Sequence, residues 1–96
     1  MEFKDTIAMM MSEDYKERFK AEYHQTKIRY EKLKAFNNKI EAARLTSYAE
    51  CGEKDKKTVP MPKHDCPDDM LLHQQRTMGE YLHILEVSAV VEGIEL

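Results

Sequence analysis

The stretch SEDYKERFKAEYHQTKIRYEKLKAFNNKIEAARLTSYAEC, residues 12–51, decides the fold. No Gly or Pro interrupts it, and one row of its residues is spaced alternately four and three apart, which places that row on one stripe of an α-helix. The stripe consists of Phe19, Tyr23, Thr26, Tyr30, Leu33, Asn37 and Ile40. At about 1.5 Å per residue the helix would extend roughly 50–60 Å. A chain of 96 residues cannot wrap a core around such a helix, so the helix needs a partner, from this chain or from a second copy.

A second helical stretch, residues 66–95, supplies such a partner. Pro67 suits the first position of a helix, and Asp68 and Asp69 complement the positive end of its dipole. One stripe consists of Leu71, Met78, Leu82, Leu85 and Ala89, with Gln75 as a polar member. A second stripe consists of Ile84, Val87, Val91 and Ile94. One partner helix does not cover both stripes, and apolar surface of this kind usually marks an interface.

The sequence therefore predicts an all-α protein, a long two-helix antiparallel hairpin that assembles into a helical homo-oligomer. Residues 1–11 form an N-terminal arm, rich in Met, which either docks on a neighbour or frays. Residues 12–96 form one helical-hairpin domain, with helices at 12–51 and 66–95 and a polar loop at 52–65 that begins with Gly52.

Two details of these helices bear on assembly. Small or apolar residues recur every seven positions on a second face of the first helix, at Ala21, Ile28, Ala35 and Ala42. This face predicts a close approach by a further helix. A polar residue in a helical seam, here Asn37, costs stability but fixes register. Gly79 weakens the second helix by about 1 kcal/mol relative to Ala and predicts a kink or a close backbone approach.

Composition and local pattern indicate a cytoplasmic protein. No apolar run approaches the roughly 20 residues that span a bilayer, and the basic-then-apolar pattern of a signal peptide is missing. An isoelectric point near 5.8 argues against nucleic acid as the partner. In the cytoplasm Cys51 and Cys66 are expected to be free thiols.

The residue pattern does not predict an enzyme. Three widely spaced glycines make no phosphate-binding loop. Cys51, His64 and Cys66 match no common zinc spacing, and Cys66 with His64 as its base lacks a third, orienting group. We therefore expect no catalytic residue, no cofactor and no metal.

The charge distribution is strongly asymmetric. Residues 15–44 contain nine basic and four acidic residues, whereas residues 65–96 contain seven acidic residues and a single basic one, Arg76. One interpretation is electrostatic complementarity between two antiparallel helices. The other is a basic surface for an anionic ligand, in which cations pair with phosphates and an aromatic ring stacks on a base. The candidate ligand residues are Tyr15, Arg18, Lys20, Lys27 and Arg76. Tyr23 and Tyr30 are interpreted as core residues of the seam.

Two stretches carry a resemblance to known proteins: YKERFKAEYHQTKIRYEKL (residues 15–33) and CPDDMLLHQQRTMGEYLHILEVSAVVEGIEL (residues 66–96). Together they resemble a crAss-like-phage-related family of short phage and prophage proteins. The ending is also similar to the helical hairpin of oligomeric phage sponges that sequester cyclic nucleotide signals of anti-phage immunity (anti-CBASS and anti-Thoeris proteins). That pattern has an Arg before the Ala of its last helix, and this chain has Ser88 there, so the role of that Arg does not carry over.

Two functions follow as expectations. The resemblance implies a non-catalytic phage anti-defence protein that acts in the bacterial cytoplasm. It would sequester a cyclic nucleotide or cyclic ADP-ribose-type signal at an oligomer interface. The alternative is a helical inhibitor or adaptor that binds a host defence protein, like an anti-CRISPR, through its excess apolar surface. In a nucleic-acid mimic of this kind, Asp68, Asp69, Glu80 and Glu86 would carry the function.

Overall fold

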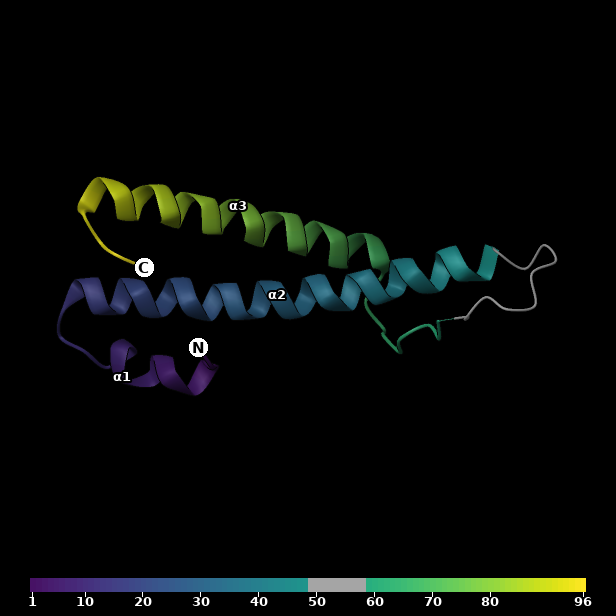
Figure 1. Ribbon diagram of the computed structural model, residues 1–96, viewed down its shortest axis with the longest axis horizontal. Helices are drawn as coiled ribbons and strands as arrows, with labels where there is room; N and C mark the ends of the chain where they lie inside the picture. Colours follow the sequence, from purple (N-terminus) through teal and green to yellow (C-terminus); the bar gives the residue numbers. More distant parts are fainter. Residues whose placement is uncertain (49–58) are drawn as a thin grey trace.

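The computed structural model describes residues 1–48 and 59–96 and, in that part of the chain, contains helices and no strand. The elements are a short 3₁₀ helix η1 (Phe3–Thr6), α1 (Ile7–Met10), α2 (Tyr15–Tyr48) and α3 (Asp68–Glu92) (Figure 1). The molecule is elongated, with extents of 60 × 25 × 24 Å. None of the described helices is long and apolar enough to cross a membrane. The prediction of an all-α fold is confirmed for these residues.

Helix α2 begins at Tyr15, three residues later than predicted. The carboxylate of Asp14 accepts a hydrogen bond from the backbone N–H of Lys16, at 3.0 Å, and so satisfies one of the free donors of the first turn. Ser12 instead accepts from the backbone N–H of Asp14, at 3.1 Å, and lies in the turn before the helix. The predicted end of this helix at Cys51 and the start of the loop at Gly52 lie outside the described residues.

Helix α3 is shorter at both ends than the predicted range 66–95. Pro67 has extended backbone angles and precedes the helix, so its predicted place inside the first turn is wrong. At the other end Gly93 adopts a left-handed conformation with φ 70°, which glycine reaches without a steric penalty. The backbone N–H of Ile94 then bonds to the carbonyl of Ala89 at 2.8 Å, which closes a Schellman-type end.

This helix end changes the role of Ile94. The residue was predicted to extend the second apolar stripe, but the chain turns at Gly93 and buries Ile94 to 7% exposure in the core. Ile84, Val87 and Val91 remain exposed, at 58%, 49% and 80%. The second stripe of α3 is therefore a patch of three residues, extended on the same side by Val90 at 82%.

Helices α2 and α3 lie side by side and run in opposite directions (Figure 1). Every member of the seven-residue stripe of α2 is buried or half-buried. The shared core consists of Phe19, Tyr23, Leu82, Leu85, Ala89 and Ile94, with Tyr30 packed against it. At roughly 1.5–3 kcal/mol for each large apolar side chain removed from water, this row supplies the main attraction between the two helices.

Tyrosine–carboxylate hydrogen bonds flank the core. Tyr23 of α2 donates to Glu86 of α3 at 3.0 Å, and Tyr81 of α3 donates to Glu22 of α2 at 2.5 Å. Burial and the bond to Glu86 raise the pKa of Tyr23, and the bond to Glu22 raises the pKa of Tyr81. Each pair joins the two helices without placing an unpaired charge in the seam.

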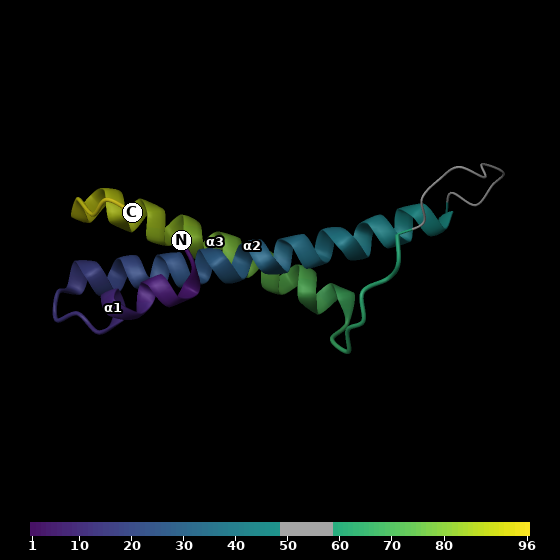
Figure 2. The ribbon, with the colours of Figure 1, turned by 60° about the horizontal axis from the view of Figure 1, so that its bottom comes forward.

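The N-terminal arm docks on α2 of its own chain (Figure 2). Thr6 and Ala21 are both fully buried where the arm meets the helix, and Gln25 donates to the hydroxyl of Thr6 at 2.9 Å. The guanidinium of Arg29 lies 5.2 Å from the ring centre of Phe3. The arm thus covers the small-residue face of α2 at Ala21, where the sequence predicted a further helix.

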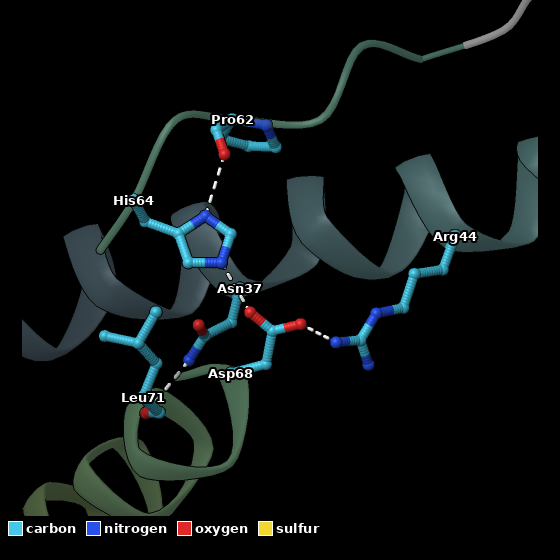
Figure 3. A network of polar contacts seen from close by, with 6 residues as sticks. All are labelled: Asn37, Arg44, Pro62, His64, Asp68 and Leu71. Atoms are coloured by element: carbon cyan, nitrogen blue, oxygen red, sulfur yellow. Dashed lines mark hydrogen bonds and ion pairs between the residues drawn. The ribbon is translucent and has the colours of Figure 1, made fainter. Parts of the chain in front are cut away.

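A polar network fixes the segment that leads into α3 (Figure 3). One ring nitrogen of His64 bonds to the carbonyl oxygen of Pro62 at 2.7 Å, and the other bonds to Asp68 at 2.5 Å. Both partners are hydrogen-bond acceptors, and the ring lies between them. Arg44 of α2 forms an ion pair with the same carboxylate of Asp68. Asp68 therefore links the start of α3 to α2 and to the preceding segment.

Candidate functional site

Two adjoining hollows lie along the α2–α3 seam and share Tyr30 and Gly79. The larger has a volume of about 620 Å³ and is lined by Tyr30, Gln75, Arg76, Gly79, Glu80, His83 and Ile84. The smaller, of about 230 Å³, is lined by Tyr23, Lys27, Tyr30, Glu31, Gly79, Leu82 and Glu86. We call the two together the Tyr30 hollow. The volume of the larger hollow lies within the range of small-molecule sites, about 300–1,000 Å³.

Gly79 shapes this hollow. A Cβ atom added to Gly79 would lie 3.3 Å from Cε1 of Tyr30, closer than an ordinary van der Waals contact. The missing side chain therefore lets the Tyr30 ring approach the backbone of α3, which is the close approach that the sequence predicted. Tyr30 is half-buried and lines both hollows.

Two of the five candidate ligand residues, Lys27 and Arg76, flank Tyr30 from opposite helices. The ammonium of Lys27 lies 5.8 Å from the ring centre of Tyr23. Neither cation forms an ion pair within residues 1–48 and 59–96. The structure thus places two exposed cations, one from each helix, around a half-buried aromatic ring.

The other three candidates lie near the start of α2 and make local contacts. Arg18 donates to the carbonyl oxygens of Ser12 and Glu13, both at 2.9 Å, and so closes the turn between the arm and the helix. The ammonium of Lys20 lies 3.5 Å from Glu17.

Tyr15, the last of the three, donates to Glu92 at 3.4 Å and contacts the ring of Phe19 edge-on, with 6.2 Å between ring centres. The structure does not bring these three residues to the Tyr30 hollow.

Sequence reasoning missed His83 and Tyr30 as lining residues. Arg76 and His83 are seven residues apart, with Gly79 between them at a spacing of three and four, and such a row lies on one helix face. That spacing was the available signal on α3. Tyr30 was predicted to be a core residue; it packs against the core but is only half-buried and lines both hollows.

Few of the oppositely charged side chains of α2 and α3 form ion pairs with each other in the described residues. Among the described residues a single ion pair, Arg44–Asp68, joins α2 to α3. Most basic side chains of α2, among them Lys27, Lys32, Lys34 and Lys39, are exposed. Solvent-exposed cations without carboxylate partners keep their attraction for anions in solution.

Of the possible metal ligands Cys51, His64 and Cys66, the structure describes only His64 and Cys66. His64 directs its two nitrogens to Pro62 and Asp68. Cys66 is an exposed free thiol, and Cys51 lies outside the described residues. No cluster of three metal-ligating side chains occurs among the residues that the structure describes.

Replacing Gly79 by Ala is expected to change the shape of the Tyr30 hollow without lowering the stability of the protein. Ala favours the helix by about 1 kcal/mol, and the Tyr30 ring has free space into which it can move by a few tenths of an ångström. We therefore expect a melting temperature equal to or above that of the wild type, together with weaker ligand binding. Thr77→Ala, on an exposed position of the same helix, is the matched control. A drop in stability for Gly79→Ala alone would show that the ring cannot move.

Comparison with known proteins identifies a family model that matches part of the chain. The family model described as Sequestin matches residues 13–53, which cover α2 and less than half of the chain. The match overlaps the first stretch of the resemblance, residues 15–33, and does not reach the second. No curated protein and no solved structure matches the chain. The similarity to Sequestin is consistent with a sequestering family and lies on the helix that contributes Lys27 and Tyr30.

Proposed function

We propose that this chain is a non-catalytic protein that binds and sequesters a cyclic nucleotide or cyclic ADP-ribose-type signal, in the manner of a phage anti-defence protein in the bacterial cytoplasm. The observation that carries the proposal is the Tyr30 hollow, with its half-buried ring between Lys27 and Arg76. Aromatic faces stack on bases, and ammonium and guanidinium groups pair with phosphates. Sequestration requires such contacts and needs no catalytic group.

The adjoining surface supports a site at the boundary between copies of the chain. Ile84 lines the larger hollow and also begins the exposed patch that continues through Val87 and Val91. A second copy packed on this patch would lie next to the hollow and would help to exclude water from the ligand. Exclusion of water strengthens ion pairs with phosphate, which are weak on an open surface. We therefore propose a homo-oligomer in which the patch of α3 is the contact.

The Sequestin match supports the sequestering part of the proposal by its name and by its position over α2. The phage and anti-defence parts rest on the resemblance of residues 15–33 and 66–96. The single inter-helix ion pair of the described residues, Arg44–Asp68, leaves the cations of the hollow available.

A thermal-shift screen against cyclic di- and trinucleotides and cyclic ADP-ribose isomers tests this function. A ligand present at 100 times its Kd stabilises the folded state by about 2.7 kcal/mol, which corresponds to a shift of roughly 10 °C for a domain of this size. We expect one class of these ligands to give such a shift and Arg76→Glu to abolish it. Lys39→Glu, an exposed lysine of α2 outside the hollow, should retain it. A flat response to every ligand would refute the proposal.

The exposed patch of α3 also supports the second candidate, a helical inhibitor that docks on a host defence protein. The nucleic-acid mimic is the weaker form of this candidate, since Asp68 pairs with Arg44 and His64, and Glu86 accepts from Tyr23. Co-purification from defence-carrying cells distinguishes the two candidates. A host protein bound in a fixed ratio, and lost in Val87→Asp but not in Arg76→Glu, would favour the inhibitor.

A further inference from the structure

A separate hollow lies between the start of the N-terminal arm and α2. It has a volume of about 470 Å³ and is lined by Met1, His24, Lys27, Ile28, Glu31 and Lys32. We call it the arm hollow. Of the residues that line the Tyr30 hollow, it shares Lys27 and Glu31 and none from α3. The arm lies against α2, where Gln25 donates to Thr6, and Met1 is the arm residue in the lining of the hollow.

Positive groups dominate the arm hollow. Lys27 and Lys32 form no ion pair, and the ring nitrogens of His24 make no hydrogen bond, within the residues that the structure describes. Glu31 is the one carboxylate in the lining. Two lysines, Met1 with the chain's amino group, and a histidine without hydrogen-bond partners among the described residues therefore line the hollow, against a single carboxylate.

The pKa of His24 is lowered by burial and by this local excess of positive charge. Burial first, and then the nearby ammonium of Lys27, the chain's amino group and Lys20, lower the pKa of the His24 imidazole. The ring also contacts the ring of Tyr23 edge-on, with 5.2 Å between centres. A bound anion would oppose these positive charges and would favour the protonated ring.

We propose that the arm hollow binds a small phosphorylated anion through His24, Lys27 and Lys32. Lysine ammonium groups bind phosphate as compact point charges, and a protonated imidazole adds a directed N–H donor. The apolar walls at Met1 and Ile28 leave room for an organic group attached to the phosphate. This site goes beyond the proposed function, because Lys32 and His24 contribute nothing to the Tyr30 hollow.

Proton NMR titration with pyrophosphate tests the proposal on the full chain. The chain contains four His residues, and the His24→Gln spectrum identifies the His24 signal. We expect saturable shifts of the His24 ring protons and a higher pKa of His24 at saturation, because the anion stabilises the charged ring. By linkage, pyrophosphate then binds more tightly as the pH falls through the pKa of His24.

Matched variants distinguish a specific anion site in the arm hollow from general attraction of pyrophosphate to the positive surface of α2. Lys32→Gln should weaken pyrophosphate binding roughly two- to fivefold, the range expected for loss of one exposed ion pair. Lys39→Gln should leave it unchanged, and Glu31→Gln should strengthen it. Equal weakening by Lys32→Gln and Lys39→Gln, or the absence of saturation, would overturn the proposal. Arg76 lines the Tyr30 hollow and not the arm hollow, so Arg76→Gln should keep pyrophosphate binding even if it loses cyclic-nucleotide binding. Loss of pyrophosphate binding in Arg76→Gln would place the anion in the Tyr30 hollow and overturn the proposal.

Discussion

Replacing Leu85 by Asp is expected to unfold the α2–α3 pair, whereas the same replacement at its neighbour Ile84 is expected to leave the pair folded. Leu85 is 6% exposed and belongs to the core, and Ile84 is 58% exposed. Loss of the buried side chain together with burial of a carboxylate without a partner costs about 3–5 kcal/mol, a large share of the stability of a small domain. An exposed substitution usually changes stability by less than about 0.5 kcal/mol. Far-UV circular dichroism with urea unfolding measures the difference.

The same pair of variants tests assembly. In the sequence, Leu85 belongs to the first apolar stripe of residues 66–95 and Ile84 to the second. In the structure only Ile84 is exposed for contact with a second copy. We expect Ile84→Asp to lower the mass measured by sedimentation at micromolar concentration while the helix content is retained. A wild-type protein that sediments as a stable monomer would contradict the proposed oligomer. Unfolding of Ile84→Asp would show that this face is already covered within the chain.

The periodicity of α2 was sufficient to predict which residues face α3. One stripe that touches one partner repeats every three or four residues, and all of its members from Phe19 to Ile40 are buried or half-buried. Periodicity does not specify what covers a second stripe. Ala21 was predicted to meet another helix, and it is the 3₁₀ helix and α1 of the same chain that bury it. Such short elements have no periodic pattern of their own.

The ends of the helices were predicted only approximately. Gly93 is the type of residue that ends a helix in a left-handed conformation, but the helix was predicted to continue past it to residue 95. Its consequence, the return of Ile94 to the core, depends on the backbone path after the helix. At the start of α2, Ser12 and Asp14 are both residue types that cap helices. Asp14 is the cap, because its carboxylate accepts the hydrogen bond from the backbone N–H of Lys16.

The candidate site was predictable in part. Cations were recognisable as a group, but the sequence did not separate Lys27 and Arg76, which flank Tyr30, from Arg18 and Lys20, which make local contacts. That separation depends on the register between α2 and α3. The register places residue 30 opposite residue 79, and it was not encoded in either helix taken alone.

The buried amide pair in the seam is the feature best suited to fix this register. Asn37 is 6% exposed, and its amide nitrogen donates to the side-chain oxygen of Gln75 at 2.8 Å and to the carbonyl of Leu71 at 3.2 Å. These bonds form only when residues 37 and 75 lie opposite each other. A shift by one helical turn would leave the amide group buried without a partner, which costs about 1–3 kcal/mol.

Replacing Asn37 by Leu is therefore expected to destabilise the protein by about 1–3 kcal/mol, because the amide of Gln75 loses its partner in the seam. Changing both Asn37 and Gln75 to Leu should recover most of that loss, since two apolar groups can pack where two amides were paired. Urea unfolding of the four proteins in this cycle gives the coupling between the two sites. If the double variant remains as unstable as the single one, the amide pair does not contribute in this way.

The double variant is also expected to lose the specificity of helix register, although it recovers stability relative to Asn37→Leu. Without the amide pair, neighbouring registers of the two helices differ less in free energy, as in helical seams from which a polar residue has been removed. The contact between Tyr30 and Gly79 would then be populated only in part. Ligand binding in the Tyr30 hollow should weaken for this reason, and also because Gln75 itself lines the hollow, even though the helices remain paired. Broadened or doubled amide signals in the NMR spectrum of a fully helical double variant would show this exchange. A single sharp set with unchanged ligand affinity would mean that the apolar stripe alone holds the register.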